Sequence, residues 1–212
     1  KGEIVGMSGD GVNDVPALKQ ADIGIAMGIT GSEVSKDAAD MILTDDNFAT
    51  IVKAVTVGRN IFTNIKNAIK YPLTGNTGAI FVVIATTLLA FFDTKYVVPF
   101  AAIQLLFINL VTDSLPAIAI GTEPGTDKVL KQAPRDLKEP ILMRSTFTAI
   151  LVEAGLIAIA VFIGYYIGIN TGEGYATTFA FLVLCLARLF NGFSCRSDLP
   201  LTKIGLFTNK NT

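Results

Sequence analysis

Four long stretches with almost no charged residues dominate the chain after its first third. Residues 71–92 carry no charge, and the other three stretches carry one each: Asp113 in 96–121, Glu153 in 145–170 and Arg188 in 174–195. Each stretch, as a helix rising about 1.5 Å per residue, is long enough to cross about 30 Å of hydrocarbon. We therefore expect four membrane spans, at about 70–92, 98–121, 146–169 and 175–195. The alternative, four buried helices of a large soluble protein, is less favoured because such runs rarely follow one another in soluble chains.

The residues before the first span show two other patterns. Apolar residues recur at helical spacing through residues 46–70, which predicts a stalk helix that continues unbroken into the first span. Residues 3–8 resemble a strand, and a glycine-rich turn and a predicted helix at Val15–Gln20 follow them. We expect an α/β head, residues 1–50, and an all-α transmembrane bundle of four helices with its stalk, residues 51–212.

Composition and charge agree with a chain that meets two different solvents. Hydrophobic residues make up 51%, charged residues only 17%, and the mean hydropathy is +0.54, whereas soluble domains average about 25% charged residues. The first fifty residues contain nine acidic and three basic side chains. These values disfavour a disordered chain, a disulfide scaffold and an ordinary soluble enzyme, and the head lacks the basic patch expected of a nucleic-acid-binding protein. The chain has no histidine, which excludes a histidine-based site within it.

Basic residues gather before the first span, between the second and third, and after the fourth. The other two connections contain a single basic residue, Lys95. The positive-inside rule then predicts that the head, the 122–144 loop and the C-terminus lie in the cytoplasm.

The segment GDGVND follows the predicted strand of the head. A strand that ends there places Asp10 at the carboxyl edge of a sheet, where open α/β sheets bind ligands. Gly9 and Gly11 permit unusual backbone angles and close approach. Asp10 and Asp14 lie four residues apart around the turn, so both could face one hard cation such as Mg²⁺. The alternative is a plain acidic turn that caps the helix Val15–Gln20.

Polar residues inside the second predicted span indicate an ion path. Asn109 and Asp113 share a helix face, and Thr112 lies three residues after Asn109. Pro116 removes a backbone donor and should free nearby carbonyl groups. Carboxylate, amide and carbonyl oxygens suit Ca²⁺, and an acidic residue inside a membrane is a functional hypothesis because its burial is costly. The alternative is a polar cluster that only joins helices.

Longer motifs add a family resemblance. The sequence SGDGVNDVPALKQADIGIAMG closely resembles the hinge motif of P-type cation-transporting ATPases, with Ser8 in place of the usual threonine. The segments GSEVSKDAADMIL and Asp45-Asp46-Asn47-Phe48 resemble the segments that follow in that family. The resemblance continues through the membrane region and covers essentially the whole chain.

For the head, the resemblance implies a haloacid-dehalogenase-like phosphorylation domain. Asp10 would bind the catalytic Mg²⁺ in the loop formed by Gly9 and Gly11, and Asn13 and Asp14 would support the phosphorylated site. The family's phosphorylated aspartate belongs to a DKTGT motif, which does not occur in these 212 residues. We therefore expect a C-terminal fragment that requires the N-terminal part of the same pump, where most of the ATP site lies, and that is inactive alone.

For the membrane region, the motif NLVTDSLPA resembles the sixth transmembrane helix of calcium pumps, and the first span resembles the fifth. The resemblance implies that Asn76, Asn109, Thr112 and Asp113 bind the transported Ca²⁺. Ala79 stands where two-calcium pumps carry a glutamate, which predicts a single Ca²⁺ site.

Two charged residues of the later spans have separate predictions. Arg188 should either extend toward the cytoplasmic face or point inward and pair with Asp113 when the ion has left. Glu153 should lie at the membrane interface without an ion role.

The resulting hypothesis is an ATP-driven, Mg²⁺-dependent calcium pump of the bacterial single-site type, which forms an aspartyl-phosphate in the plasma membrane. The alternatives are a P-type pump for Mn²⁺ or Na⁺ and a truncated membrane scaffold without catalysis.

Overall fold

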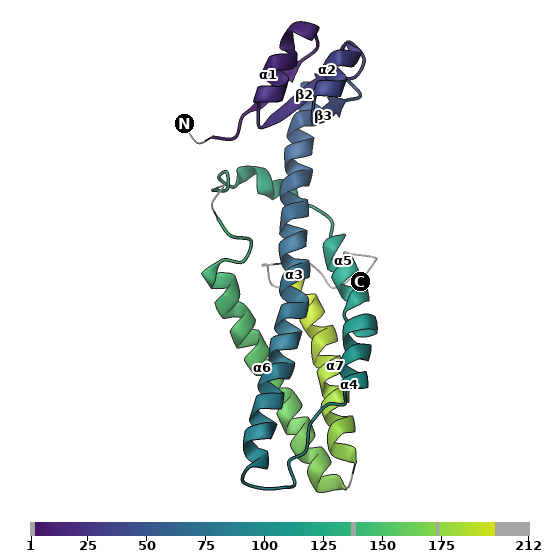
Figure 1. Cartoon of the computed structure of the whole chain (residues 1–212), viewed down its shortest axis with the longest axis vertical. Helices are drawn as coiled ribbons and strands as arrows, with labels where there is room; N and C mark the ends of the chain where they lie inside the picture. The colour runs from purple at the N-terminus through teal and green to yellow at the C-terminus, as the bar shows by residue number, and fades with distance from the viewer. Residues whose placement is uncertain (1–2, 137–138, 173, 198–212) are drawn as a thin grey trace. The chain divides into compact units, whose positions relative to one another are not determined.

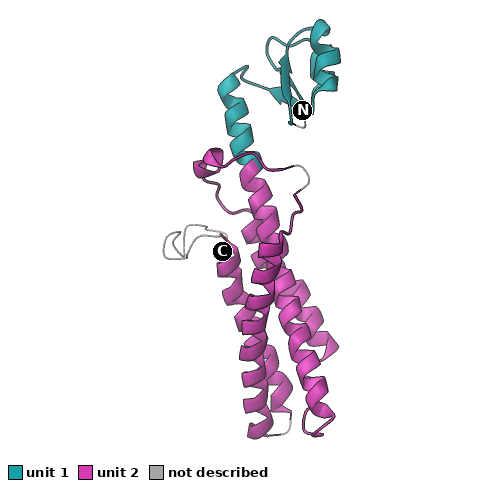
Figure 2. Cartoon of the chain, turned by 90° about the vertical axis from the view of Figure 1, so that its left-hand side faces the viewer, with its two compact units in different colours: residues 1–58 teal, residues 59–212 magenta. Residues whose placement is uncertain are grey.

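The computed structural model describes residues 3–136, 139–172 and 174–197 and divides the chain into two compact units, Lys1–Gly58 and Arg59–Thr212 (Figure 2). The basic C-terminal segment that was predicted to be cytoplasmic, from residue 198 onward, lies outside the described residues.

The first unit contains a small parallel sheet connected by short helices (Figure 1). The strands are hydrogen-bonded in the order β1-β2-β3, and parallel neighbours require a crossover, here supplied by α1 and α2. The central strand β2 is the most buried and joins an apolar cluster with β3 and the start of α3. The elements are β1 (Gly6–Gly9), η1 (Val12–Asp14), α1 (Val15–Gln20), β2 (Ile23–Met27), α2 (Glu33–Ala38) and β3 (Met41–Leu43).

The first strand is shorter than the sequence predicted. It begins at Gly6, opposite Ile23, the first residue of β2. The preceding residue, Val5, donates its N–H to the Asp22 carboxylate at 2.9 Å and accepts from the Asp22 N–H at 3.1 Å. The expected strand at 3–8 is therefore corrected to 6–9, because residues 3–5 have no strand residues opposite them.

The second unit consists mainly of long apolar helices, and four helices of the described residues are long and apolar enough to cross a membrane. Each of the four predicted spans largely coincides with one of these helices, and the chain is a multi-pass integral membrane protein. The elements are α3 (Phe48–Ala90, which begins in the first unit), α4 (Ala102–Phe107), η2 (Ile108–Thr112), α5 (Ser114–Gly121), η3 (Asp127–Lys131), α6 (Arg144–Thr171) and α7 (Tyr175–Cys195).

The helix α3 confirms the predicted continuity of stalk and first span. Its 43 residues form one helix despite Pro72 in its interior. At about 1.5 Å per residue it measures about 65 Å, roughly twice the hydrocarbon thickness. About half of α3 therefore extends beyond the apolar layer.

The second span is not a uniform helix. A π-helical segment, η2, separates α4 from α5, and the Asp113 N–H donates to the Ile108 carbonyl at 2.9 Å, five residues back. The helix begins at Ala102, later than the predicted start at 98. Single π-turns inside helices often mark functional sites, and this one lies directly before Asp113.

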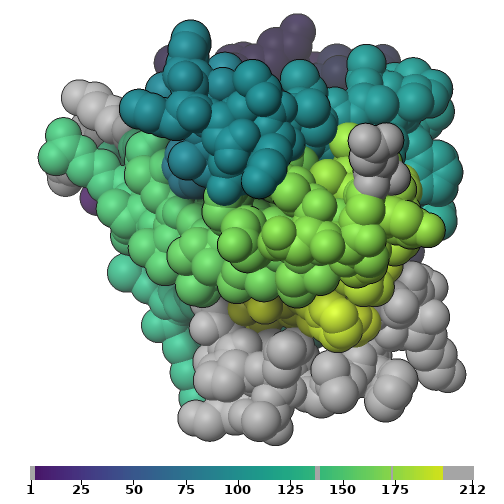
Figure 3. Space-filling view, turned by 90° about the horizontal axis from the view of Figure 1, so that it is seen from below, coloured from purple at the N-terminus to yellow at the C-terminus, as the bar shows by residue number. Residues whose placement is uncertain are grey.

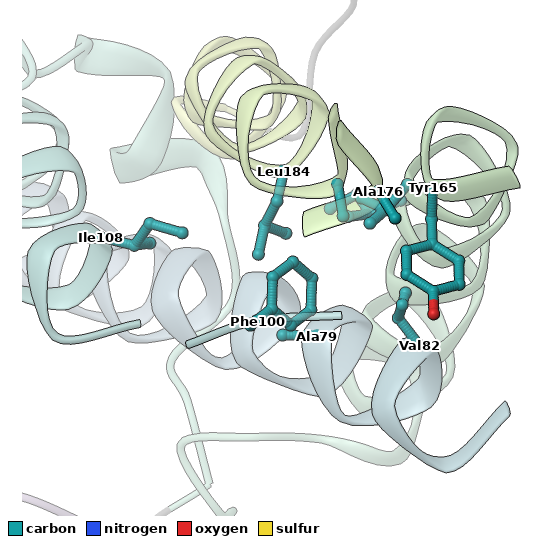
Figure 4. Packing of buried hydrophobic residues seen from close by; sticks show 10 residues of the cluster. Ala79, Val82, Phe100, Ile108, Tyr165, Ala176 and Leu184 are labelled. Carbon is teal, nitrogen blue, oxygen red and sulfur yellow. The ribbon is translucent and has the colours of Figure 1, made fainter. Parts of the chain in front are cut away.

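An apolar core holds α3, α6 and α7 together with η2. Val161, Tyr165, Ala180 and Leu184 are fully buried in it, and Figure 4 shows Ala79 beside Phe100 in the same cluster. The ends of α3, α6 and α7 lie side by side in the space-filling view of Figure 3. Polar side chains of α3, η2 and α7 lie next to this core and form the candidate site.

Candidate functional site

A buried guanidinium lies at the centre of the membrane unit. Arg188 of α7 has the largest fully buried side chain of the described residues, with 1% of its surface exposed. Its Nη2 donates to Asn76 Oδ1 at 2.6 Å, and its Nη1 donates to Asn109 Oδ1 at 3.5 Å and to Asp113 Oδ2. The structure thus brings together three of the four predicted ion ligands around one cation. We call Asn76, Asn109, Asp113 and Arg188 the polar centre.

Two further side chains border the polar centre. The Tyr71 hydroxyl donates to the second Asp113 oxygen at 3.5 Å, and Tyr71 is itself buried. Thr112, the fourth predicted ligand, interacts with Cys185 of α7. Asp113 is 5% exposed, whereas Asn76 and Asn109 each present an exposed face in this chain. The carboxylate is therefore the innermost oxygen donor of the group.

The direction of Arg188 decides between the two predictions made for it. Its guanidinium forms an ion pair with Asp113, so the prediction that it extends toward the cytoplasmic face is wrong. A charge in an apolar surrounding is strongly stabilised by an adjacent opposite charge, and Asp113 supplies it. Arg196, two turns later, instead pairs with Glu123 at 2.8 Å.

The backbone around Asp113 offers additional oxygen atoms. Pro116 has no N–H, so the Thr112 carbonyl lacks its usual helical donor. The Ser114 hydroxyl donates to the Leu110 carbonyl at 2.7 Å, which replaces part of the hydrogen bonding that the π-helical segment disturbs. The expectation of freed carbonyl groups near Pro116 agrees with this irregular backbone.

A second ion pair connects α3 and α6. Lys70 Nζ lies 2.6 Å from Glu153 Oε1, and their side chains are 15% and 28% exposed. The other carboxylate oxygen, Glu153 Oε2, is buried without a hydrogen-bond partner among the described residues. Glu153 thus has a specific cationic partner.

In the head, Asp14 fastens the loop that carries Asp10. Its Oδ2 accepts the N–H groups of Asp10 at 3.1 Å and Gly11 at 3.0 Å. These bonds, that from Gly11 foremost, lower the pKa of the Asp14 carboxyl. A Cβ atom on Gly9 would lie 2.5 Å from the Asp14 Cβ, so the close approach expected at Gly9 is present. The unusual backbone expected at Gly11 is not, because its φ of −103° is extended.

Asp10 lies directly after β1, at the carboxyl edge of the sheet, and its side chain is exposed. Its carbonyl accepts from Ser32 N–H at 2.8 Å and from Ser35 Oγ at 3.0 Å, which fixes the main chain without using the carboxylate. Asn13 is also exposed, in the short helix η1. The Asp10 carboxylate is therefore accessible at this edge, whereas one oxygen of Asp14 already binds the backbone.

The sequence of the membrane region matches a known protein family. The family described as cation transporting ATPase, C-terminus, matches residues 97–211, more than half of the chain. The chain belongs to the cation-transporting ATPases. The chain spans about 23% of the length of two bacterial relatives that it matches.

Several of these relatives are named calcium-transporting ATPases. One from Listeria monocytogenes is 50% identical over 99% of this chain and 23% of its own length. Another from Lactococcus lactis is 47% identical over 98% of this chain and 23% of its own length. A calcium-transporting ATPase type 2C member 2 from Rattus norvegicus is 42% identical over 99% of this chain and 22% of its own length.

Within this cation-transporting ATPase chain, sequence reasoning missed the residues that hold the polar centre in place. Tyr71 was not predicted to contact Asp113, and no role was assigned to Gly75, which packs against the Arg188 guanidinium. The Lys70–Glu153 pair was missed as well. A lysine directly before the first uncharged stretch and a glutamate within the third were the available signal, but 83 residues separate them.

Proposed function

We propose that the chain is the C-terminal part of an ATP-driven P-type calcium pump of the plasma membrane, which works through an aspartyl-phosphate formed elsewhere in the same protein. The observation that carries this proposal is the polar centre, in which a buried carboxylate and two amide oxygens meet around Arg188 between helices long and apolar enough to cross a membrane. The names of the relatives support Ca²⁺ as the transported ion. Mn²⁺ and Na⁺ have no such support.

In this proposal residues 1–50 form the C-terminal part of a haloacid-dehalogenase-like phosphorylation domain. Support comes from the parallel β1-β2-β3 sheet and from the exposed Asp10 at its carboxyl edge. One carboxylate with water and phosphate oxygens is a typical Mg²⁺ environment, so Asp10 fits this ion, with Asn13 and Asp14 supporting the loop. When bound, Mg²⁺ neutralises charge on the transferred phosphoryl group. Asp14 holds the N–H groups of the loop, and Gly9 leaves room for it.

Residues 51–212 form the stalk and the transport region. Asn76, Asn109, Thr112 and Asp113 bind one Ca²⁺, and the rest of the protein completes its coordination. Arg188 competes with the ion for the same oxygens, because its guanidinium already contacts three of these residues. Its positive charge replaces that of the ion once Ca²⁺ has left, so that Asp113 does not remain an isolated buried charge.

The surroundings of Ala79 support a single ion. Ala79 is 7% exposed and belongs to an apolar cluster with Val82, Phe100 and Leu184 (Figure 4). A second Ca²⁺ at this position would require oxygen ligands, which apolar side chains do not supply. The adjacent Arg188 would also repel it.

The direct test is ATP hydrolysis by the intact, purified protein in membranes or detergent. Micromolar Ca²⁺ should stimulate hydrolysis, and sealed vesicles should accumulate radioactive calcium in an ATP-dependent way. Stimulation by Mn²⁺ or Na⁺ but not by Ca²⁺ would overturn the assignment of the ion. A full-length chain that hydrolyses no ATP under any of these ions would overturn the pump itself.

A further inference from the structure

The surface of α3 has no side chain at the place where Arg188 lies against it. A Cβ atom built on Gly75 would lie 2.7 Å from Arg188 Nε, 2.9 Å from Cζ and 3.2 Å from Cδ. Cβ contacts below 3.0 Å are essentially never seen, so the guanidinium could not keep its position beside alanine. Alanine is the better helix former. The glycine is therefore explained by the space it leaves, not by helix geometry.

The neighbouring glycine of α3 serves a different contact. A Cβ on Gly78 would meet Ile157 at 3.1 Å and the Ala154 carbonyl at 3.2 Å, both on α6. Gly78 therefore permits close packing of two helices, whereas Gly75 accommodates a single charged group. The effects of substitutions at Gly75 and at Gly78 can therefore be measured independently.

The guanidinium is held by hydrogen bonds at the edge opposite Gly75. Its two terminal nitrogens are held by Asn76, Asn109 and Asp113, and the side chain is 1% exposed. Its Nε, which faces Gly75, is buried and has no hydrogen-bond partner among the described residues. A buried donor without a partner destabilises its conformation. The contacts at the opposite edge and the space at Gly75 together fix the group, so a shift away from Gly75 must break at least one of those contacts.

We propose that Gly75 is a positioning residue that sets the calcium affinity of the pump, because it allows Arg188 to occupy the oxygens that bind the ion. The inference rests on the proposed function and deepens it. With a methyl group at position 75, Arg188 is displaced from the polar centre and competes less well with Ca²⁺. Calcium affinity should then increase, whereas a merely structural glycine would lower it or leave it unchanged.

The experiment compares Gly75→Ala with Gly155→Ala in the intact protein by equilibrium binding of radioactive calcium. Gly155 lies in α6, and a Cβ there meets nothing within 4 Å. Gly155→Ala therefore controls for the general effect of replacing a helical glycine by alanine. We expect Gly75→Ala to bind Ca²⁺ about tenfold more tightly, within the range of coupling between residues in contact. Gly155→Ala should bind as the wild type does. Unchanged or weaker binding by a folded Gly75→Ala would overturn the proposal.

The same exchange in an Arg188→Met background isolates the cause. Because methionine removes the guanidinium, Gly75→Ala should have no effect on calcium affinity there. An equal effect in both backgrounds would show that Gly75 acts on something other than Arg188. If Gly75→Ala alone does not fold, Gly75→Ala/Asp113→Asn/Arg188→Met should restore folding, because neither the guanidinium nor an unpaired carboxylate then remains, and failure to do so would equally overturn the proposal. A wild-type protein that binds no Ca²⁺ would instead refute the proposed function.

Discussion

The two units hold their carboxylates in different ways. In the first unit, backbone N–H groups bind them: Asp14 accepts from Asp10 and Gly11, and Asp46 accepts from three successive N–H groups at residues 28–30. In the second unit, carboxylates within or next to the helices pair with basic side chains, in the pairs Asp113–Arg188, Glu153–Lys70 and Glu123–Arg196.

The difference follows from the backbone and the solvent. Loops at strand ends have N–H groups that no sheet or helix uses, and carboxylates can bind them in water. Inside a long helix every N–H already bonds to a carbonyl, so an acidic side chain in an apolar region needs a cationic partner. Loss of one partner should therefore loosen a loop in the first unit but leave a buried charge unpaired in the second.

The largest effect should come from Asp10, whose exposed carboxylate lies at the carboxyl edge of the sheet. Asp10→Asn should abolish phosphoenzyme formation in the intact protein, because the exchange removes the negative charge that binds Mg²⁺. Its stability should remain near that of the wild type, since the side chain is exposed. Labelling of the intact protein with radioactive ATP measures the phosphoenzyme. Normal labelling of Asp10→Asn would contradict the assignment of Mg²⁺ binding to Asp10.

Asp113→Asn should abolish phosphorylation that depends on Ca²⁺, while phosphorylation by inorganic phosphate should remain. In the reaction cycle that the family resemblance implies, the first reaction needs an occupied ion site and the second an empty one. Arg188 then lacks its counterion, so the variant should also lose about 3–5 kcal/mol of stability. The double variant Asp113→Asn/Arg188→Met should recover stability without recovering Ca²⁺ dependence. Undiminished activation by Ca²⁺ would place the ion site elsewhere.

Lys70→Met tests the second ion pair. It leaves Glu153 partly buried without a cation, and we expect a loss of about 1–3 kcal/mol, below the full value for a buried pair because both side chains retain some exposure. Unfolding in detergent measures this loss, with Lys66→Met, one turn earlier on α3, as the control. Lys70→Met/Glu153→Gln should restore most of the stability. Equal losses for both lysine variants would argue against a specific pair.

The smallest effect should be the pH dependence of the loop at residues 28–30, which the Asp46 carboxylate holds. The N–H groups of residues 28–30, that of Ile29 foremost, lower the pKa of the Asp46 carboxyl to about 2. Because the folded pKa is below the ordinary value of 3.8, the stabilisation is fully present above about pH 4 and is lost as the pH falls through about 2. Hydrogen exchange of the loop should be faster in Asp46→Asn than in the wild type above pH 4. The two proteins should converge near pH 2, and a difference that persists there would contradict this cause.

The features that could be predicted from the sequence are those with local signals. The uncharged stretches predicted the four spans, the repeat of apolar residues predicted the continuous α3, and the helix Val15–Gln20 begins and ends at the predicted residues. Asn76, Asn109 and Asp113, which the motifs grouped as one site, meet around Arg188, while their binding of Ca²⁺ stays a prediction.

Most partners of these residues could not be predicted, because they depend on packing between distant segments. The Asp113–Arg188 pair was one of two alternatives that the sequence left open. The Arg188 guanidinium meets Asp113, 75 residues away, only where Gly75 leaves space on a third helix. The π-helical segment before Asp113 likewise follows from how the helices fit together, although Pro116 marked the region as irregular. In the head, the bonds of Asp14 to the loop depend on backbone angles that a motif alone does not specify.

We propose that one polar centre, partly occupied by Arg188, binds one calcium ion. Equilibrium binding of radioactive calcium to the intact, purified protein counts the ions per phosphorylation site directly. We expect one Ca²⁺ per site and a Hill coefficient near one, because Ala79 lies among apolar side chains and Arg188 repels a second cation. Two calcium ions bound cooperatively at each phosphorylation site would contradict it.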